Sequence, residues 1–282
     1  MDLPIQTAET RITRREHGLV EGRTDRVAIE EPLEIRMVFS DGNASREKSV
    51  SITMRTPGHD RDLAAGFLFG EGILRNPADV TSIAGCGPVT GPHQGQNIVK
   101  VTMAGGARIA WPKLERHFYA TSSCGVCGKA SLDALEVEGV APIDRDGFAI
   151  DGDVITALPG RLRERQGVFD QTGGLHAAAL FNETGDLVDI REDVGRHNAV
   201  DKLIGARFLA GKVPLSRHLL FLSGRASFEL VQKAVVAGIP AVAAVGAPSS
   251  LAIDLARRFD VTLMGFVREG RFNIYHGAWR IK

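Results

Sequence analysis

The chain has only three cysteines in 282 residues, Cys86, Cys124 and Cys127. Three thiols cannot build the disulfide framework of a secreted scaffold, and their pattern suits a reducing cytoplasm. The chain also lacks net charge, because 34 basic residues balance 34 acidic ones. A neutral chain has no overall field that attracts nucleic acid or an anionic membrane, so any anion must be bound by local groups.

The first 26 residues contain no apolar run and carry five arginines and five acidic residues. They lack the core of a signal peptide, so we expect a mobile tail and a cytoplasmic protein. The longest uncharged stretch, residues 234–253, has the length of a membrane span but is interrupted by glycine, proline and serine. Because unpaired backbone groups are costly in lipid, we expect a helix end, a buried strand and the next helix there.

The N-terminal region has the pattern of an α+β subdomain. Apolar residues alternate over residues 27–39 and 50–54, which predicts an antiparallel hairpin. We expect a helix from Asp60 to about Gly70, a loop across the glycine-rich residues 85–95, and another strand over residues 98–103.

The C-terminal region alternates between continuous apolar runs and helical patterns. The apolar runs cover residues 174–181, 218–223, 240–245 and 261–266, and the helical patterns cover residues 198–209, 227–237 and 249–259. Strands without polar alternation, separated by amphipathic helices, predict an α/β fold with a mainly parallel sheet covered by helices on both faces.

These patterns divide the chain into four parts. We expect a tail over residues 1–26, an N-terminal subdomain over 27–115, a cysteine loop with its following helix over 116–135, and an α/β domain over 136–282.

The strongest chemical signal is the pair Cys124 and Cys127, which are separated by two residues and flanked by Gly125 and Gly128. A helix start near Gly128 and the charge of Lys129 would favour thiolate, since such surroundings lower a thiol pKa from about 8.5 to roughly 3.5–7.5. Redox or sulfur chemistry is the favoured interpretation. Half of a metal site and incidental packing are the alternatives.

A catalytic zinc site is not expected. Zinc deaminases combine such a cysteine pair with an H-x-E sequence, and no histidine here is followed two positions later by glutamate. A second C-x-x-C for a structural zinc is also lacking. We expect Cys86 to be a small buried or loop thiol.

Three connections between predicted strands and helices are equipped to hold an anion. They cover residues 192–198, 223–227 and 246–250, and they carry small residues, hydroxyls, Arg225 and helix N-termini. Right-handed crossovers would gather them at one edge of the sheet, which predicts a ligand crevice there. The alternative is that Ser227 and Ser249 only cap helices.

Further candidates lie near the same edge. His176 and His197 could act as acid, base or hydrogen-bond donor. Two arginines and a glycine follow the last strand in residues 265–272, a composition that suits phosphate and purine recognition, with a solvated turn as the alternative.

Together these motifs resemble the formate dehydrogenase accessory (FdhD) family of sulfur carriers. The resemblance rests on stretches that occur in order across most of the chain: residues 55–60, 70–73, 123–128, 172–178, 191–202, 223–229 and 265–275.

The resemblance implies a function. A cysteine desulfurase would load sulfur onto Cys124 as a persulfide, with Cys127 as its partner. The sulfur would then pass to the bis-molybdopterin guanine dinucleotide form of the molybdenum cofactor before this enters formate dehydrogenase. Matching stretches put the cofactor at Phe266, Val267, Arg268, Glu269, Gly270 and Arg271, and the residues of the predicted crevice add Ser223, Arg225, Ser249, His176 and His197.

The resemblance also implies a cytidine-deaminase-like fold with an added N-terminal subdomain, a homodimer, and no catalytic zinc. Guanine nucleotides such as GDP would mimic the cofactor. Two other functions remain open: a thiol-disulfide oxidoreductase with a nucleotide-binding crevice, and a chaperone that holds the cofactor without using its thiols.

Overall fold

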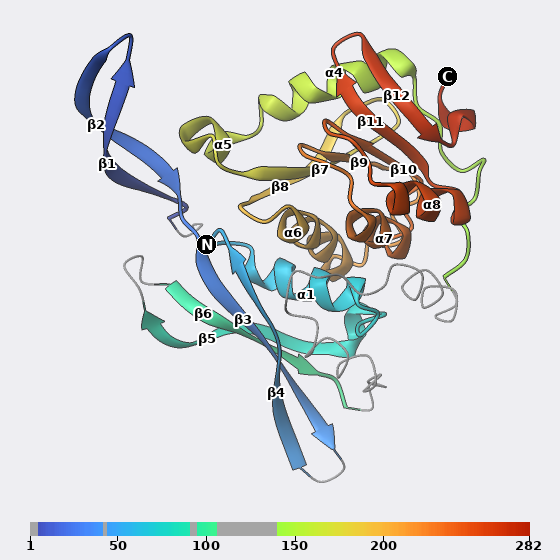
Figure 1. Cartoon of the computed structure of the whole chain (residues 1–282). Helices are drawn as coiled ribbons and strands as arrows, with labels where there is room; N and C mark the ends of the chain where they lie inside the picture. The colour runs from blue at the N-terminus through green and yellow to red at the C-terminus, as the bar shows by residue number, and fades with distance from the viewer. Residues whose placement is uncertain (1–4, 42–43, 91–94, 106–139) are drawn as a thin grey trace.

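The computed structural model describes residues 5–41, 44–90, 95–105 and 140–282. The N-terminal elements are β1 (Thr7–Glu16), β2 (Leu19–Ala28), β3 (Glu31–Asp41), β4 (Ala44–Arg55), α1 (Asp60–Gly70), the 3-10 helix η1 (Pro77–Asp79), β5 (Val80–Thr90) and β6 (Gly95–Met103). The C-terminal elements are α4 (Gly152–Arg163), α5 (Gly167–Thr172), β7 (His176–Phe181), β8 (Leu187–Asp193), α6 (Arg196–Leu209), β9 (Leu219–Leu222), α7 (Phe228–Val236), β10 (Ala241–Ala244), α8 (Ser250–Arg258), β11 (Thr262–Arg268), β12 (Arg271–His276) and the 3-10 helix η2 (Ala278–Arg280). Figure 1 shows them as a mixed α/β structure.

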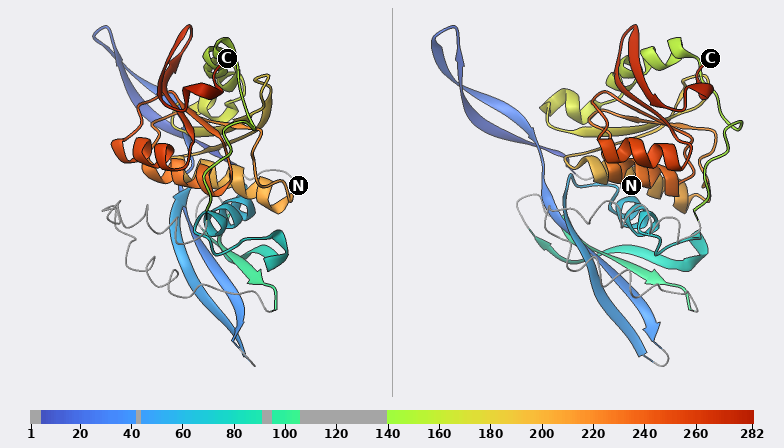
Figure 2. Two further views of the ribbon diagram at one scale, coloured as in Figure 1. Left: turned by 90° about the vertical axis from the view of Figure 1, so that its right-hand side faces the viewer. Right: turned by 45° about the vertical axis from the view of Figure 1, so that its right-hand side comes forward.

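Strands β1 and β2 form a long hairpin where the sequence predicts a mobile tail. His17 and Gly18 at its tip have φ angles of 49° and 86°, and two central residues with positive φ match the tight turn that joins twisted antiparallel strands. The strands pair in register from Thr7 opposite Ala28 to Glu16 opposite Leu19. The expectation of a tail is wrong because this turn and register organise the segment as a ribbon that projects from the body (Figure 2).

The second sheet has the strand order β4-β3-β6-β5, and α1 packs against it. The predicted hairpin and the helix from Asp60 are confirmed as β3-β4 and α1. The predicted loop over residues 85–95 is wrong in its first half, because β5 continues to Thr90 and pairs with β6. Gly87, with a φ of 91°, lies in an irregular stretch of this pairing and lets the strand continue without a clash against Ile98.

The third sheet has the order β12-β11-β10-β9-β7-β8. The pairings β9-β10 and β10-β11 are parallel, whereas β11-β12, β7-β9 and β7-β8 are antiparallel, so the expectation of a mainly parallel sheet is corrected to a mixed one. For the β7-β8 pair the reason is local. Residues 182–185 form a tight turn at Gly185, with a φ of 76°, which returns the chain beside β7 as a hairpin.

Helices cover both faces of this sheet, as the continuous apolar strands predict. Helices α6, α7 and α8 lie on one face and α4 on the other (Figure 1). Residues 234–253 form the end of α7, then β10, then the start of α8, as expected. Throughout the part of the chain that the structure describes, every helix falls short of the length and apolar character that a membrane span needs.

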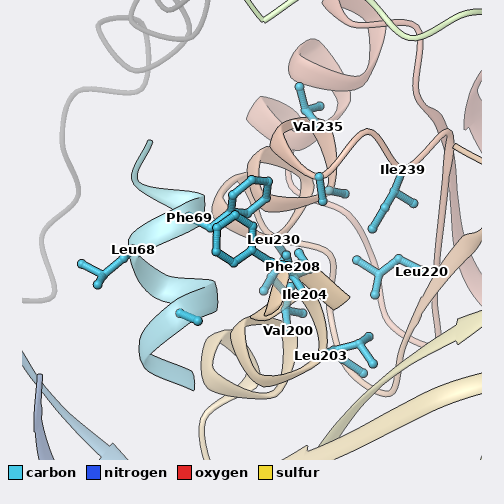
Figure 3. Packing of buried hydrophobic residues seen from close by; sticks show 14 of the residues in the cluster. Leu68, Phe69, Val200, Leu203, Ile204, Phe208, Leu220, Leu230, Val235 and Ile239 are labelled. Atoms are coloured by element: carbon cyan, nitrogen blue, oxygen red, sulfur yellow. The ribbon is translucent and has the colours of Figure 1, made fainter. Parts of the chain in front are cut away.

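The main core joins the two regions of the chain. It lies between α1, on the N-terminal sheet, and helices α6 and α7 (Figure 3). The rings of Phe69 and Phe208 meet there with centroids 4.9 Å apart. The backbones of α1 and α6 also touch, since a Cβ on Gly66 or Gly205 would lie 1.9 Å from a carbonyl oxygen of the other helix. The two regions therefore share one tightly packed core.

Candidate functional site

One edge of the six-stranded sheet gathers the candidate residues. Strands β8, β9, β10 and β11 point in the same direction, and β7 begins where they end. His176 at the start of β7 lies opposite Asp193 at the end of β8, and Ser223 donates its backbone N–H to Ala177. The three connections that the sequence singles out therefore meet at this edge, as predicted.

Backbone hydrogen bonds tie these connections to one another. Gly246 donates to the carbonyl of Gly224 at 2.8 Å, Ala226 to that of Ala247 at 3.2 Å, and Phe266 to that of Gly246 at 3.1 Å. The amides of Ala226 and Gly246 lie in connections that were expected to hold an anion, and instead each bonds to a carbonyl of the neighbouring connection. The small residues have a packing reason, since a Cβ on Gly246 would lie 3.0 Å from the backbone of Arg225.

The serines at this edge have different roles. Ser249 Oγ accepts from the N–H of Ala252 at 3.3 Å, so it caps α8, which is the alternative that the sequence left open. Ser227 makes no such cap, and its Oγ lies 3.4 Å from Nε2 of His197. Ser223 Oγ accepts from the N–H of Ala177 at 2.8 Å. The interpretation of Ser227 as a cap is therefore wrong.

Both histidines are held neutral at pH 7. Burial, reinforced by Lys233 and Arg196, lowers the pKa of His197 to about 4. Burial and the charge of Arg196 also lower the pKa of His176. His176 packs over Gly224, where an added Cβ would lie 3.3 Å from its Nδ1. Each neutral imidazole at this edge can donate one hydrogen bond and accept one.

The 266–271 stretch forms the turn between β11 and β12. Phe266 is 44% exposed and has a φ of 54°, whereas Val267 is fully buried in the core beneath α4. Val267 is therefore a core side chain, and its assignment as a cofactor contact is not supported by its position. Arg268 donates to the carbonyl of Val245 at 2.7 Å. Arg271 lies opposite Arg268 across the strand pair, with Glu269 and Gly270 exposed in the turn between them.

A pocket of about 500 Å³ opens beside this edge. Its walls come from α4, α5 and the strand ends, and they include Leu162, Gln166, Phe169, His176, Ser223 and Val245. Glu192 fixes α5 in place, since its carboxylate accepts from the backbone N–H groups of Val168 and Phe169 at 3.1 and 3.0 Å. Two of the candidate residues, His176 and Ser223, thus line a preformed cavity.

The remaining matched motifs build the contact between the two regions. Arg55 is 1% exposed and forms a two-pronged ion pair with Asp60, at 3.0 and 2.9 Å. The next residue, Thr56, donates its N–H to Asp193 and accepts from Lys202 through its carbonyl. A second buried pair, Asp201 and Lys233, lies 2.7 Å apart. These residues hold the edge in place and do not line it.

The two catalytic candidates, Cys124 and Cys127, lie outside the described residues. The third thiol, Cys86, is half-buried in β5 and pairs with Ile98 across the sheet, so it is a strand residue and not part of a loop. The described ranges contain no group of three or more histidine, cysteine or acidic side chains able to hold a metal ion. The absence of zinc from the cysteine loop stays a prediction.

Sequence reasoning missed the α4-α5 wall of the pocket. Gln166 and Phe169 were not singled out because no motif contains them. Neither α4 nor α5 was predicted, and Gln166 lies in the short connection between these two helices. A signal was present in Asp151, which caps α4 by accepting from the N–H of Asp153 at 2.8 Å.

A family model of the FdhD/NarQ family matches residues 28–282. Curated relatives named sulfur carrier protein FdhD are similar over nearly their whole length. The Streptomyces coelicolor protein is 52% identical over 277 residues, covering 98% of this chain and 95% of its own. The Mycobacterium tuberculosis protein is 46% identical over 280 residues, covering 98% of each chain.

A solved structure has the same architecture. The crystal structure provisionally assigned as a formate dehydrogenase accessory protein from Desulfotalea psychrophila superimposes with a TM-score of 0.75 at 25% identity. The match covers 99% of this chain and 100% of that one.

Proposed function

The chain belongs to the FdhD/NarQ family, and we propose that it is a sulfur carrier that supplies sulfur for formate dehydrogenase. In this proposal a cysteine desulfurase loads Cys124, and the sulfur passes to the bis-molybdopterin guanine dinucleotide form of the molybdenum cofactor. The observation that carries the proposal is the full-length similarity to proteins named sulfur carrier protein FdhD.

The chemistry needs two sulfur transfers, one onto Cys124 and one from Cys124 to the acceptor. The Cys124 thiolate attacks the outer sulfur of the desulfurase persulfide, so that a new S–S bond forms and the desulfurase thiolate leaves. In onward transfer the outer sulfur is again the electrophile: the acceptor supplies the electron pair for the new bond and is thereby oxidised by two electrons, the S–S bond breaks, and Cys124 leaves as thiolate. Alternatively, Cys127 attacks Cys124, forms a disulfide and expels hydrosulfide, after which a dithiol reductant must restore both thiols.

The edge of the six-stranded sheet is the proposed cofactor site. Arg268 and Arg271 lie together at the β11-β12 turn, exposed Phe266 precedes them, and Arg225 is exposed on the neighbouring connection. Guanidinium groups fork onto phosphate oxygens, which suits the two diphosphates of the cofactor. GDP should bind there as a partial mimic. A homodimer remains part of the proposal on the strength of the family resemblance, and a cytoplasmic location on the pattern of the cysteines.

Two other functions use overlapping features of the chain. A thiol-disulfide oxidoreductase would need both cysteines and no desulfurase. A cofactor chaperone would need the pocket and neither cysteine. Cysteine variants separate the chaperone from sulfur transfer, and omission of the desulfurase separates the oxidoreductase.

The test is activation of sulfur-free formate dehydrogenase by this protein, a cysteine desulfurase and cysteine. Wild type and Cys86→Ala should activate the enzyme, and Cys124→Ala should not. Full activation by a Cys124→Ala/Cys127→Ala protein would establish the chaperone instead. Activation without desulfurase, accompanied by reduction of a model disulfide, would favour the oxidoreductase.

A further inference from the structure

The ribbon formed by β1 and β2 has free strand edges. It is a sheet of two strands, and among the described residues neither strand has a further neighbour. Nearly all of its side chains are exposed, and it stands away from the body (Figure 2). A lone two-stranded hairpin is only marginally stable in water, and a free edge is a template for another strand. This combination points to a partner strand.

The turn at the tip fixes which backbone groups of β1 face outward. A two-residue turn is closed by a hydrogen-bonded pair, here Glu16 and Leu19, and hydrogen-bonded pairs alternate along an antiparallel ladder with pairs that exchange no bonds. The even-numbered residues of β1 therefore direct their N–H and C=O groups to β2, and the odd-numbered residues direct theirs to the free edge. Because β1 contains no proline and its pairing has no bulge, this edge is regular.

The free edge of β1 is complementary to itself. In an antiparallel pair, residues that direct their backbone groups outward must lie opposite one another. A register centred on Ile12 meets this condition, and it sets Glu9 opposite the second copy's Arg15 at two symmetric positions. The neighbouring registers that also meet it would set Arg11 opposite a second Arg11 or opposite Arg15, and like charges directly opposite each other are destabilising. The charges therefore select the register centred on Ile12.

This register supplies a partner for an unpaired charge. Arg14 pairs with Glu16 at 3.0 Å. Arg26 pairs with Glu9 at 3.3 Å. Arg15, by contrast, is exposed and makes no ion pair or hydrogen bond with any residue that the structure describes. In the paired ribbons, the second copy's Glu9 would lie between Arg15 and its own Arg26.

Exposed apolar side chains stand at both ends of the ribbon. Leu19 and Val20 at the tip are 76% and 66% exposed, and Ile5 at the base is 68% exposed. Antiparallel pairing about Ile12 places the tip of each ribbon beside the base of the other. The pairing would therefore shield apolar surface that the single chain leaves in water.

We propose that the β1 strands of two copies of this chain pair edge to edge, antiparallel and centred on Ile12, and so join two ribbons into one four-stranded sheet. The inference rests on the homodimer of the proposed function, to which it assigns a contact face. It uses neither the cysteines nor the cofactor site, so it stands or fails separately from sulfur transfer.

The test is disulfide linkage between two copies of an Ile12→Cys protein. Position 12 would face itself in a pair without hydrogen bonds, where Cα atoms lie about 4.5 Å apart, within the range of roughly 4.4–6.8 Å that a disulfide spans. Mild oxidation should link the chains, and mass spectrometry should find residue 12 joined to residue 12. Thr24→Cys is the matched control, because Thr24 lies on β2, separated from the second copy by β1. No linkage at position 12, or equal linkage at both positions, would overturn the proposal.

Two charge reversals test the register through the rate of this linkage. Added to Ile12→Cys, Arg15→Glu sets two acidic side chains opposite each other at both symmetric positions and should slow linkage on the order of tenfold. Arg11→Glu changes the charge equally, but Arg11 lies opposite Thr13 and diagonal to the second copy's arginines. Linkage should then be unchanged or faster. Equal slowing by both reversals would show that overall charge, such as attraction to another protein's acidic surface, governs the contact, and the register would be wrong.

A mixed pair of variants gives a second measure that does not depend on Ile12. Thr10 lies opposite the second copy's Arg14 in the same register, so a mixture of Thr10→Cys and Arg14→Cys proteins should link position 10 to position 14. Linkage of position 10 to itself at the same rate would contradict the register. Light scattering of wild type separates this inference from the homodimer. The mass of one chain would overturn both, whereas the mass of two chains without these linkages would overturn the ribbon pairing alone.

Discussion

Asp193 and Lys202 form an ion pair that is closed to solvent, with Oδ2 and Nζ 2.7 Å apart and both side chains 0% exposed. The same aspartate accepts from the backbone of Gly195 at 2.8 Å and of Thr56 at 3.2 Å. Lys202 also donates to the Thr56 carbonyl at 2.7 Å. This pair therefore connects the sheet edge of the C-terminal region to the strand end of the N-terminal sheet.

Replacing Lys202 by methionine should destabilise the protein by about 3–5 kcal/mol, because it leaves a buried carboxylate without its counter-charge. The matched control is Arg217→Met, which removes an ion pair with Glu183 whose arginine is 72% exposed. Its cost should be below about 1 kcal/mol. Urea denaturation measures the free energy of unfolding of both variants. Equal and small losses would show that the buried pair does not hold the two regions together.

The contact of α1 with α6 should not tolerate a side chain at Gly205. A Cβ there would lie 1.9 Å from the carbonyl oxygen of Asp62 and 2.6 Å from the backbone nitrogen of Gly66. Backbone atoms, unlike flexible side chains, cannot move to relieve this clash. Gly205→Ala should therefore lower the free energy of unfolding by about 3 kcal/mol or more. Gly160→Ala in α4, where the new Cβ meets nothing within 4 Å, should be neutral or stabilise by up to about 1 kcal/mol. Melting temperatures that fall equally in both variants would contradict the packing described for α1 and α6.

His197 should make stability depend on pH. Its surroundings include Arg196, Lys233 and Glu229, and its folded pKa of about 4 lies below the unfolded value of about 6.5. A depressed pKa means that the unfolded chain takes up the proton first, so the stability present above pH 6.5 is lost as pH falls toward 4. Between pH 7 and 5, wild type should lose more stability than His197→Gln. Parallel pH profiles for the two proteins would refute this.

The sequence predicted the sheet edge because its signals are local. The apolar runs before Ser223 and Gly246 are continuous, which predicts buried parallel strands. The carboxyl ends of parallel strands lie at the same edge of a sheet, so the connections that follow them lie there too. The sequence did not predict which amides would be free there. Whether the N–H of Gly246 meets a ligand or the carbonyl of Gly224 depends on the distance between two connections, and that distance is a property of the whole sheet.

The pocket could not be predicted for a similar reason. Gln166 has no sequence neighbour that marks it, and it matters because folding buries its carboxamide beside strands from another part of the chain. Asp193 and Lys202 are a second example, since both occur in the 191–202 stretch that carries the family resemblance. From sequence alone, charged residues in such a stretch suggest ligand binding. The structure shows instead that these two charges pair with each other. The hairpin of β1 and β2 was missed because its residues are nearly all exposed, so apolar alternation is weak.

We expect a homodimer, on the basis of the family resemblance. Light scattering should give a mass twice the 30.3 kDa of one chain, independent of concentration over the micromolar range. A constant mass near 30.3 kDa would rule out the dimer and leave the monomer as the working unit.

The most direct test of sulfur transfer is the mass of the peptide that carries Cys124 after incubation with a cysteine desulfurase and cysteine. The account predicts the gain of one sulfur atom on Cys124, its removal by reductant, and no gain in a Cys124→Ala protein that melts like wild type. If Cys124→Ala instead takes the sulfur on Cys127 and activates formate dehydrogenase fully, Cys124 is not the carrier and the central claim is contradicted.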